Sequence, residues 1–212
     1  MNFLETKMNA RRRTGLAIVG GLAAALAGAS AQAKPAPDLA TALQRVQVAD
    51  DPLEPAVVIT TERVAPSTRG VLSTRYNDNH LRAVVDRRSG EVRYELKQTL
   101  QYMGGFRDFQ QANYQAPAGV AVAALDRLDS NRVHCEALDT QEACFEVVSF
   151  TVPEGTLREM AANAADGWQF KFKPRFGAEH RTQMSRTEIQ ALLQAVETYR
   201  GRSAPAAVQG QH

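Results

Sequence analysis

Two cysteines, Cys135 and Cys144, are the thiol-bearing residues of the chain, and eight residues separate them. If they face each other across a hairpin, pairing continues inward to residues 138 and 141 and leaves Asp139–Thr140 as a two-residue turn. Asp-Thr is not a favoured pair for the tightest hairpin turns, so a wider loop is the alternative. Because an even number of cysteines in an exported chain typically forms disulfides, the spacing predicts a hairpin clasp.

The same cysteines fit redox or metal chemistry poorly. Redox pairs usually follow the C-x-x-C pattern, which eight intervening residues do not reproduce. A zinc site needs three or four ligands. Only His134 lies nearby, and in a strand its side chain points to the face opposite Cys135. The other histidines stand in no metal-binding spacing, so we predict no metal and no cofactor.

The stretch 102–114, "YMGGFRDFQQANY", is the strongest candidate for a binding site. It combines four aromatic residues with two glycines, an arginine and an aspartate. One interpretation is a binding loop in which Phe106, Phe109 and Tyr114 supply contact surface and Arg107 binds a carboxylate or phosphate. The alternative is a connection whose aromatic residues cover the core of the sheet.

Motifs for covalent catalysis and for phosphate binding are absent from the sequence. There is no G-x-S-x-G, no S-x-x-K with its partner motifs, no H-E-x-x-H and no phosphate-binding glycine loop followed by lysine. Glu179–His180 is the one acidic–histidine neighbour pair. A general base also needs a nucleophile and an orienting acid, so no catalytic residue is assigned.

Residues 1–33 have the pattern of a cleavable signal peptide. Arg11–Arg13 are basic, Gly15–Ala27 are apolar, and Ala31 and Ala33 are small residues of an A-x-A site. The apolar segment is shorter than the ~20 residues that a membrane-spanning helix needs. We expect cleavage near Ala33 and a periplasmic or secreted location, by general secretion or by the twin-arginine route.

Removal of residues 1–33 changes the charge balance. Basic residues fall from 25 to 21 and acidic residues from 23 to 22, so the net charge changes from +2 to −1. Nucleic-acid binding proteins usually carry a basic domain or stripe, and we therefore predict no nucleic-acid partner. The remaining residues are enough for one domain with a core of its own.

The elements that must position these residues are mostly strands. Residues 34–55 predict a linker with a short helix capped by Asp38, and residues 56–201 a single domain. Alternation in residues 81–85 and 92–100 around the turn 86–90 predicts an antiparallel hairpin. Further strands are expected at 57–61, 119–125, 132–136, 145–152 and 168–173, with residues 106–114 as a connection.

Two helices are expected late in the chain. One follows Pro153, and the other begins at a capping box of Ser185 and Glu188 and ends at Gly201. Residues 202–212 predict a disordered tail. This order favours an α+β fold, a mostly antiparallel sheet of hairpins with two late helices packed on it.

The segment 84–114, the cysteine pair, "WQFKFKPRFG" and "SRTEIQALLQAVETY" together resemble small exported bacterial proteins of unassigned activity. The resemblance implies export and a compact domain, and it supplies no catalytic residue.

We therefore expect a soluble, non-catalytic binding or accessory module without a membrane segment after cleavage. Its partner would be a small molecule or an envelope protein. The alternatives are a small periplasmic hydrolase-like enzyme and an envelope protein that pairs through an exposed sheet edge.

Overall fold

The computed structural model describes residues 37–65, 67–69, 74–76, 79–126, 133–138, 141–165 and 167–203. All the described residues belong to one compact unit. The predicted signal peptide and residues 204–212 of the predicted tail lie outside the described residues.

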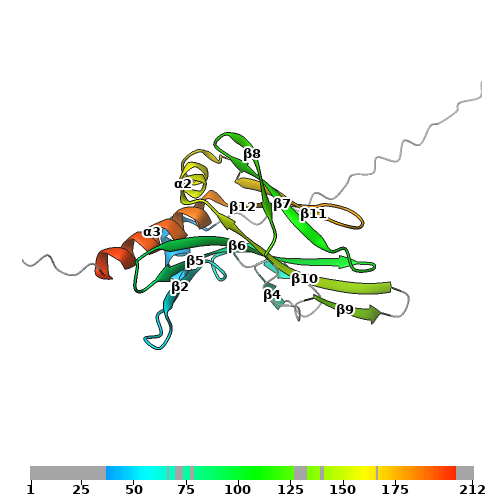
Figure 1. Cartoon of the computed structure of the whole chain (residues 1–212), viewed down its shortest axis with the longest axis horizontal. Helices are drawn as coiled ribbons and strands as arrows, with labels where there is room; N and C mark the ends of the chain where they lie inside the picture. Colours follow the sequence, from blue (N-terminus) through cyan, green and yellow to red (C-terminus); the bar gives the residue numbers. More distant parts are fainter. Residues whose placement is uncertain are drawn as a thin grey trace, which may run out of the picture. The chain divides into compact units, whose positions relative to one another are not determined.

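Two antiparallel sheets make up most of this unit (Figure 1). The six-stranded sheet has the order β1 (Gln47–Ala49), β2 (Ala56–Thr60), β5 (Asn79–Asp86), β6 (Val92–Met103), β10 (Gln141–Val152) and β9 (Val133–Leu138). The four-stranded sheet has the order β12 (His180–Met184), β11 (Trp168–Pro174), β7 (Phe109–Ala116) and β8 (Gly119–Ala124). A separate two-stranded sheet joins β3 (Ser67–Arg69) to β4 (Thr74–Tyr76).

Three helices complete the fold, and two of them come late in the sequence. They are α1 (Leu39–Arg45), α2 (Glu154–Asn163) and α3 (Arg186–Ser203). α3 packs against β2 and β5, and both other helices contact α3. The α+β fold expected from the sequence is confirmed, and α1 lies where a short helix was expected within residues 34–55.

The main hydrophobic core lies between the six-stranded sheet, the four-stranded sheet and the late helices α2 and α3, and a smaller cluster of Ala42, Val64 and Ala191 joins α1 to α3. Phe150 of β10 stands at the centre of the main core, with ring centroids 5.2 Å from Tyr114, 6.4 Å from Trp168 and 6.2 Å from Phe172. Near α3 the same core continues with Ile189, Leu192, Leu193 and Val196 of that helix. A single core therefore fixes both sheets and the late helices relative to one another.

Several local predictions are confirmed. β5 and β6 form the expected hairpin, with Gly90 at positive φ in its turn. Asp38 caps α1 by accepting a hydrogen bond from the Thr41 amide at 2.9 Å. The Ser185 hydroxyl accepts the Glu188 amide at 3.2 Å.

Two predicted boundaries are wrong. α3 continues past Gly201 to Ser203, because a single exposed glycine weakens a helix without ending it. Residues 109–114 are not a connection, since β7 begins at Phe109. β7 contains a register shift, in which Lys173 pairs with Gln111 and Pro174 with Phe109. That bulge disrupts the alternation by which the strand could have been found.

Candidate functional site

The structure separates the four candidate binding residues into two groups. Phe109 and Tyr114 lie on β7 and are 1% and 7% exposed, so both belong to the core. Phe106 is 40% exposed and Arg107 is half-buried, and both lie in the loop 104–108 between β6 and β7. Only Phe106 and Arg107 can meet a partner without a change in the core.

A second loop, from the turn between β11 and β12, lies beside this one. The amides of Arg175 and Phe176 donate to the carbonyls of Asp108 and Arg107 at 2.8 Å and 3.0 Å. The two loops are about 70 residues apart in sequence, yet these two backbone hydrogen bonds join them as a short bridge. Phe176, 55% exposed, and Arg175 thereby join Phe106 and Arg107 on one surface.

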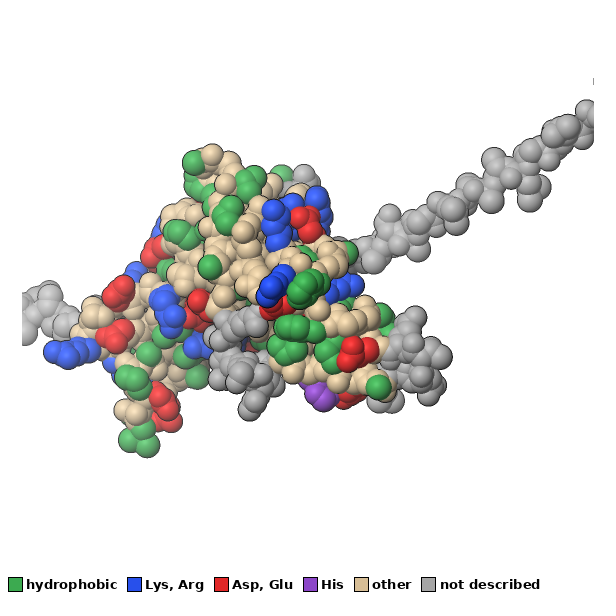
Figure 2. Space-filling view, turned by 45° about the vertical axis from the view of Figure 1, so that its right-hand side comes forward, with side chains coloured by type: hydrophobic (Ala, Val, Ile, Leu, Met, Phe, Trp, Pro, Cys, Tyr) green, Lys and Arg blue, Asp and Glu red, His purple; other side chains and the backbone are tan. Residues whose placement is uncertain are grey.

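We call this surface the apolar–cationic patch and define it as Met103, Phe106, Arg107, Arg175 and Phe176. Met103, at the end of β6, is 49% exposed. On the face that Figure 2 shows, hydrophobic, basic and acidic side chains lie next to one another. Aromatic and arginine side chains are the types enriched at binding hot spots, and exposed apolar groups beside cations suit an apolar partner with negative charge.

A buried hydrogen-bond network holds the first loop in place. The Tyr102 hydroxyl donates to the carboxylate of Glu146, which is 2% exposed, and accepts from the Arg107 amide at 3.0 Å. The other carboxylate oxygen of Glu146 accepts from the Phe109 amide at 3.3 Å. The Arg107 guanidinium lies 4.4 Å from the centre of the Tyr102 ring, within the range of a cation–π contact.

Local backbone geometry adds to this anchoring. Asp108 has φ 57°, a left-handed conformation that is uncommon outside glycine and asparagine. Gly177 has φ 80°, and a Cβ there would lie 3.6 Å from the Arg107 side chain. The Arg107 guanidinium also donates to the Ala178 carbonyl at 3.4 Å. The backbone of the two loops and the Arg107 side chain are therefore held in place without a partner, which lowers the entropic cost of binding.

Burial, followed by the hydrogen bond to Glu146, raises the pKa of Tyr102 to about 12. The Tyr102 hydroxyl is therefore protonated across the physiological range and remains a donor. Tyr102→Phe leaves the buried Glu146 carboxylate with one donor fewer, so we expect a loss of about 1–2 kcal/mol in the free energy of unfolding. Urea denaturation of Tyr102→Phe, Glu146→Gln and the double variant measures this loss in the free energy of unfolding. Strict additivity of the two single effects would contradict the network.

Glu179 and His180, the acidic–histidine neighbour pair of the sequence, have separate surroundings in the structure. The Glu179 carboxylate accepts from the Lys171 ammonium at 3.0 Å and lies 3.5 Å from the Arg181 guanidinium. The Lys171 hydrogen bond lowers the pKa of Glu179. The His180 ring lies 6.4 Å from the Phe172 ring. Ion pairing with Lys171 and Arg181 thus accounts for Glu179, which lies in the connection between β11 and β12.

The two cysteines form the predicted disulfide. Cys135 of β9 pairs directly with Cys144 of β10, and the ladder continues to residues 138 and 141, as the spacing predicted. The turn residues Asp139–Thr140 lie outside the described residues. Glu142 is the third member of the one group in the described part with metal-ligand types close together. Both sulfurs there are bonded to each other, so neither is a thiolate ligand.

His80 and His134 lie on the six-stranded sheet, and each has surroundings that the local structure accounts for. Burial lowers the pKa of His80 on β5 to about 4, against an opposing contribution from Glu62. His134 on β9 lies 2.9 Å from a Glu136 carboxylate oxygen.

No family model, no curated protein and no solved structure matches this chain. No helix in the described part of the chain is long and apolar enough to cross a membrane.

The sequence predicted two of the five patch residues, Phe106 and Arg107. Met103, Arg175 and Phe176 were not among the predicted binding residues. A signal was present in Arg175-Phe176-Gly177, an exposed aromatic in a glycine turn. Only the fold brings that turn to the loop 104–108.

Proposed function

We propose that this protein is an exported, non-catalytic binding module that contacts its partner through the apolar–cationic patch. The observation that supports this proposal is the presentation of Phe106 and Phe176 to solvent by two loops that are hydrogen-bonded to each other. Exposed aromatic side chains contribute nothing to the core here. Their fixed arrangement beside Arg107 and Arg175 suits recognition rather than folding.

Export is supported by the disulfide. Cystines persist in oxidising compartments and are rare in the bacterial cytosol. Together with the signal-peptide pattern of residues 1–33, the Cys135–Cys144 bond favours a periplasmic or secreted location. A compact module with a fixed binding surface functions in such a compartment without any cofactor.

The second candidate function, pairing through a sheet edge, is supported by β8. This strand ends the four-stranded sheet, and its Val120 and Val122 are 73% and 60% exposed. An apolar edge strand offers unpaired backbone groups to a strand from another protein. The patch is favoured because it combines apolar surface with charge and with a fixed conformation.

Affinity capture from envelope extract tests the proposal. The exported form is immobilised, and bound proteins and small molecules are quantified by mass spectrometry. We expect the double variant Phe106→Ser/Phe176→Ser to lose its specific partners at least about tenfold. The variant Val120→Ser, which removes a more exposed apolar side chain elsewhere, should keep them. Unchanged capture by the double variant would overturn the proposal, and loss with Val120→Ser instead would favour the sheet edge.

A further inference from the structure

A leucine projects from the opposite end of the six-stranded sheet. Leu53 lies in the loop 50–55 between β1 and β2, and it is 92% exposed, the highest exposure among the large hydrophobic residues of the described part. The loop extends away from the sheet at the lower left of Figure 1. An apolar side chain that is presented so fully contributes little to folding, because it buries almost no surface.

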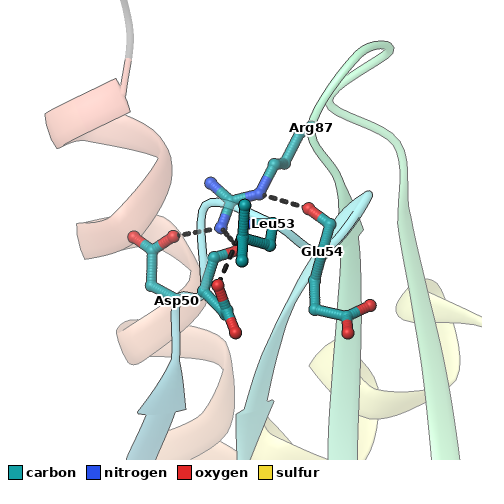
Figure 3. Close-up of polar contacts among 5 residues, drawn as sticks. Asp50, Leu53, Glu54 and Arg87 are labelled. Carbon is teal, nitrogen blue, oxygen red and sulfur yellow. Dashed lines mark hydrogen bonds and ion pairs between the residues drawn. The ribbon is translucent and has the colours of Figure 1, made fainter.

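Hydrogen bonds and two prolines restrain the loop that carries Leu53 (Figure 3). Arg87, in the neighbouring turn after β5, donates from its guanidinium to the Asp50 carboxylate, to the Asp51 carbonyl at 2.6 Å and to the Glu54 carbonyl at 2.9 Å. The Leu53 amide donates to the Asp51 carboxylate at 2.9 Å. The prolines at positions 52 and 55 restrict the backbone further. Leu53 is therefore held outward before any partner binds.

Acidic side chains surround this leucine. In the loop 50–55 and the adjoining turn 86–91, the acidic residues outnumber the basic residues Arg87 and Arg88. The acidic residues are Asp50, Asp51, Glu54, Asp86 and Glu91, and all of them are exposed. We call Leu53 with Asp50, Asp51 and Glu54 the acidic leucine tip. It is an apolar group with negative charge, the chemistry that suits the apolar–cationic patch.

One copy of the chain cannot join its own tip to its own patch. The tip is bound to the turn that precedes β6, whereas the patch begins with Met103 at the end of β6. β6 has 12 residues, which at ~3.3 Å per residue separates the two surfaces by about 40 Å. Contact between them therefore requires two molecules.

The geometry points to head-to-tail self-association, in which the acidic leucine tip of one copy docks on the apolar–cationic patch of the next. This inference rests on the proposed function of the patch and names a second copy of this chain as its partner. Leu53 packs among Met103, Phe106 and Phe176, and Glu54 faces Arg107 or Arg175. Because the two surfaces differ, the contact is heterologous, so it builds an open chain or a closed ring.

Self-association is measured by sedimentation of the exported form from about 10 µM to about 1 mM, a range suited to a small interface. We expect the average mass to rise with concentration and to fall with added salt, which screens the charged pairs. Leu53→Ser and Phe176→Ser should each weaken association at least about tenfold. Val120→Ser should leave it unchanged. Thermal unfolding confirms that each variant folds, since all three side chains are exposed.

A mixture of Leu53→Ser and Phe176→Ser, the two variants defective in association, is the decisive test of the head-to-tail contact. Leu53→Ser retains a working patch and Phe176→Ser retains a working tip, so an equimolar mixture should form a one-to-one dimer and nothing larger. A charge reversal adds a second check: Arg175→Glu should weaken association, and the double variant Arg175→Glu/Glu54→Lys, in which every contact pairs two reversed surfaces, should restore part of it. A symmetric or non-specific contact would show neither rescue.

Three outcomes would overturn the inference: a wild-type monomer at every concentration, association that survives both substitutions, or no dimer in the mixture. Loss of self-association together with patch-dependent capture of a different partner would leave the proposed function standing. Capture that ignores Phe106→Ser/Phe176→Ser would instead remove the proposed function. Binding of the patch to phosphatidylglycerol vesicles without self-association would likewise replace a second copy with a lipid surface.

Discussion

Phe150→Ala is expected to lower the free energy of unfolding by about 3–5 kcal/mol, the range for truncating a buried aromatic side chain. Phe150 is 0% exposed on β10, in the six-stranded sheet. Its ring contacts Tyr114 of β7 and Trp168 and Phe172 of β11, all in the four-stranded sheet. Truncation therefore opens a cavity at the junction of the two sheets, where neither sheet can move in to fill it.

The matched control is Phe176→Ala, the same substitution at a position that is 55% exposed. We expect it to change the free energy of unfolding by no more than about 0.5 kcal/mol. Urea denaturation followed by circular dichroism and by fluorescence of the single tryptophan, Trp168, measures both. Equal losses in the two variants would contradict the shared core. The control also shows that patch variants can be tested for binding without loss of the fold.

Regular alternation explains which strands were predictable. Along β6, Val92, Tyr94 and Leu96 point to the core side and charged residues to the other, so the hairpin with β5 could be assigned from sequence. The disulfide register was also predictable, because strand pairing and cysteine spacing permit one alignment once the two sulfurs are opposed. Alternation of apolar and polar residues is enough to predict a strand where the side chains on one face are apolar and those on the other are polar.

β7 was missed because its environment does not repeat in this way. Phe109 and Ala112 are both buried, three positions apart, since the bulge at the register shift adds a residue. Gln110, Gln111 and Asn113 are also amide residues with weak preference for strands. The aromatic stretch 102–114 consequently resembled a binding loop, although three of its four rings, those of Tyr102, Phe109 and Tyr114, belong to the core.

The surfaces that carry the proposals depend on contacts between distant segments. Arg87 belongs to a hairpin turn, and its sequence gives no sign that its guanidinium binds the loop 50–55. Glu188, in the first turn of α3, similarly accepts a hydrogen bond from the Thr61 hydroxyl at 2.6 Å, across 127 residues. Sequence patterns report local periodicity, whereas such pairings are set by how the whole sheet folds.

The Cys135–Cys144 disulfide is expected to contribute about 3 kcal/mol to the free energy of unfolding, because a closed loop of this length restricts the unfolded chain. Cys144 is fully buried beside β6, whereas β9 is the edge strand and, in the described part, pairs with β10 alone. Loss of the bond should therefore release β9 first. Urea denaturation of wild type with and without reductant, and of Cys135→Ser/Cys144→Ser, measures the total effect.

Hydrogen exchange locates that effect within the fold. After reduction we expect peptides that cover Val133–Leu138 to lose protection, while peptides that cover Asn79–Asp86, in the middle of the six-stranded sheet, keep most of theirs. The Cys135→Ser/Cys144→Ser variant should not respond to reductant, which separates the disulfide from general effects of the reagent. Equal stability with and without reductant would contradict a structural role. Free thiols at both positions in exported material would contradict the oxidising compartment itself, and with it the main support for export.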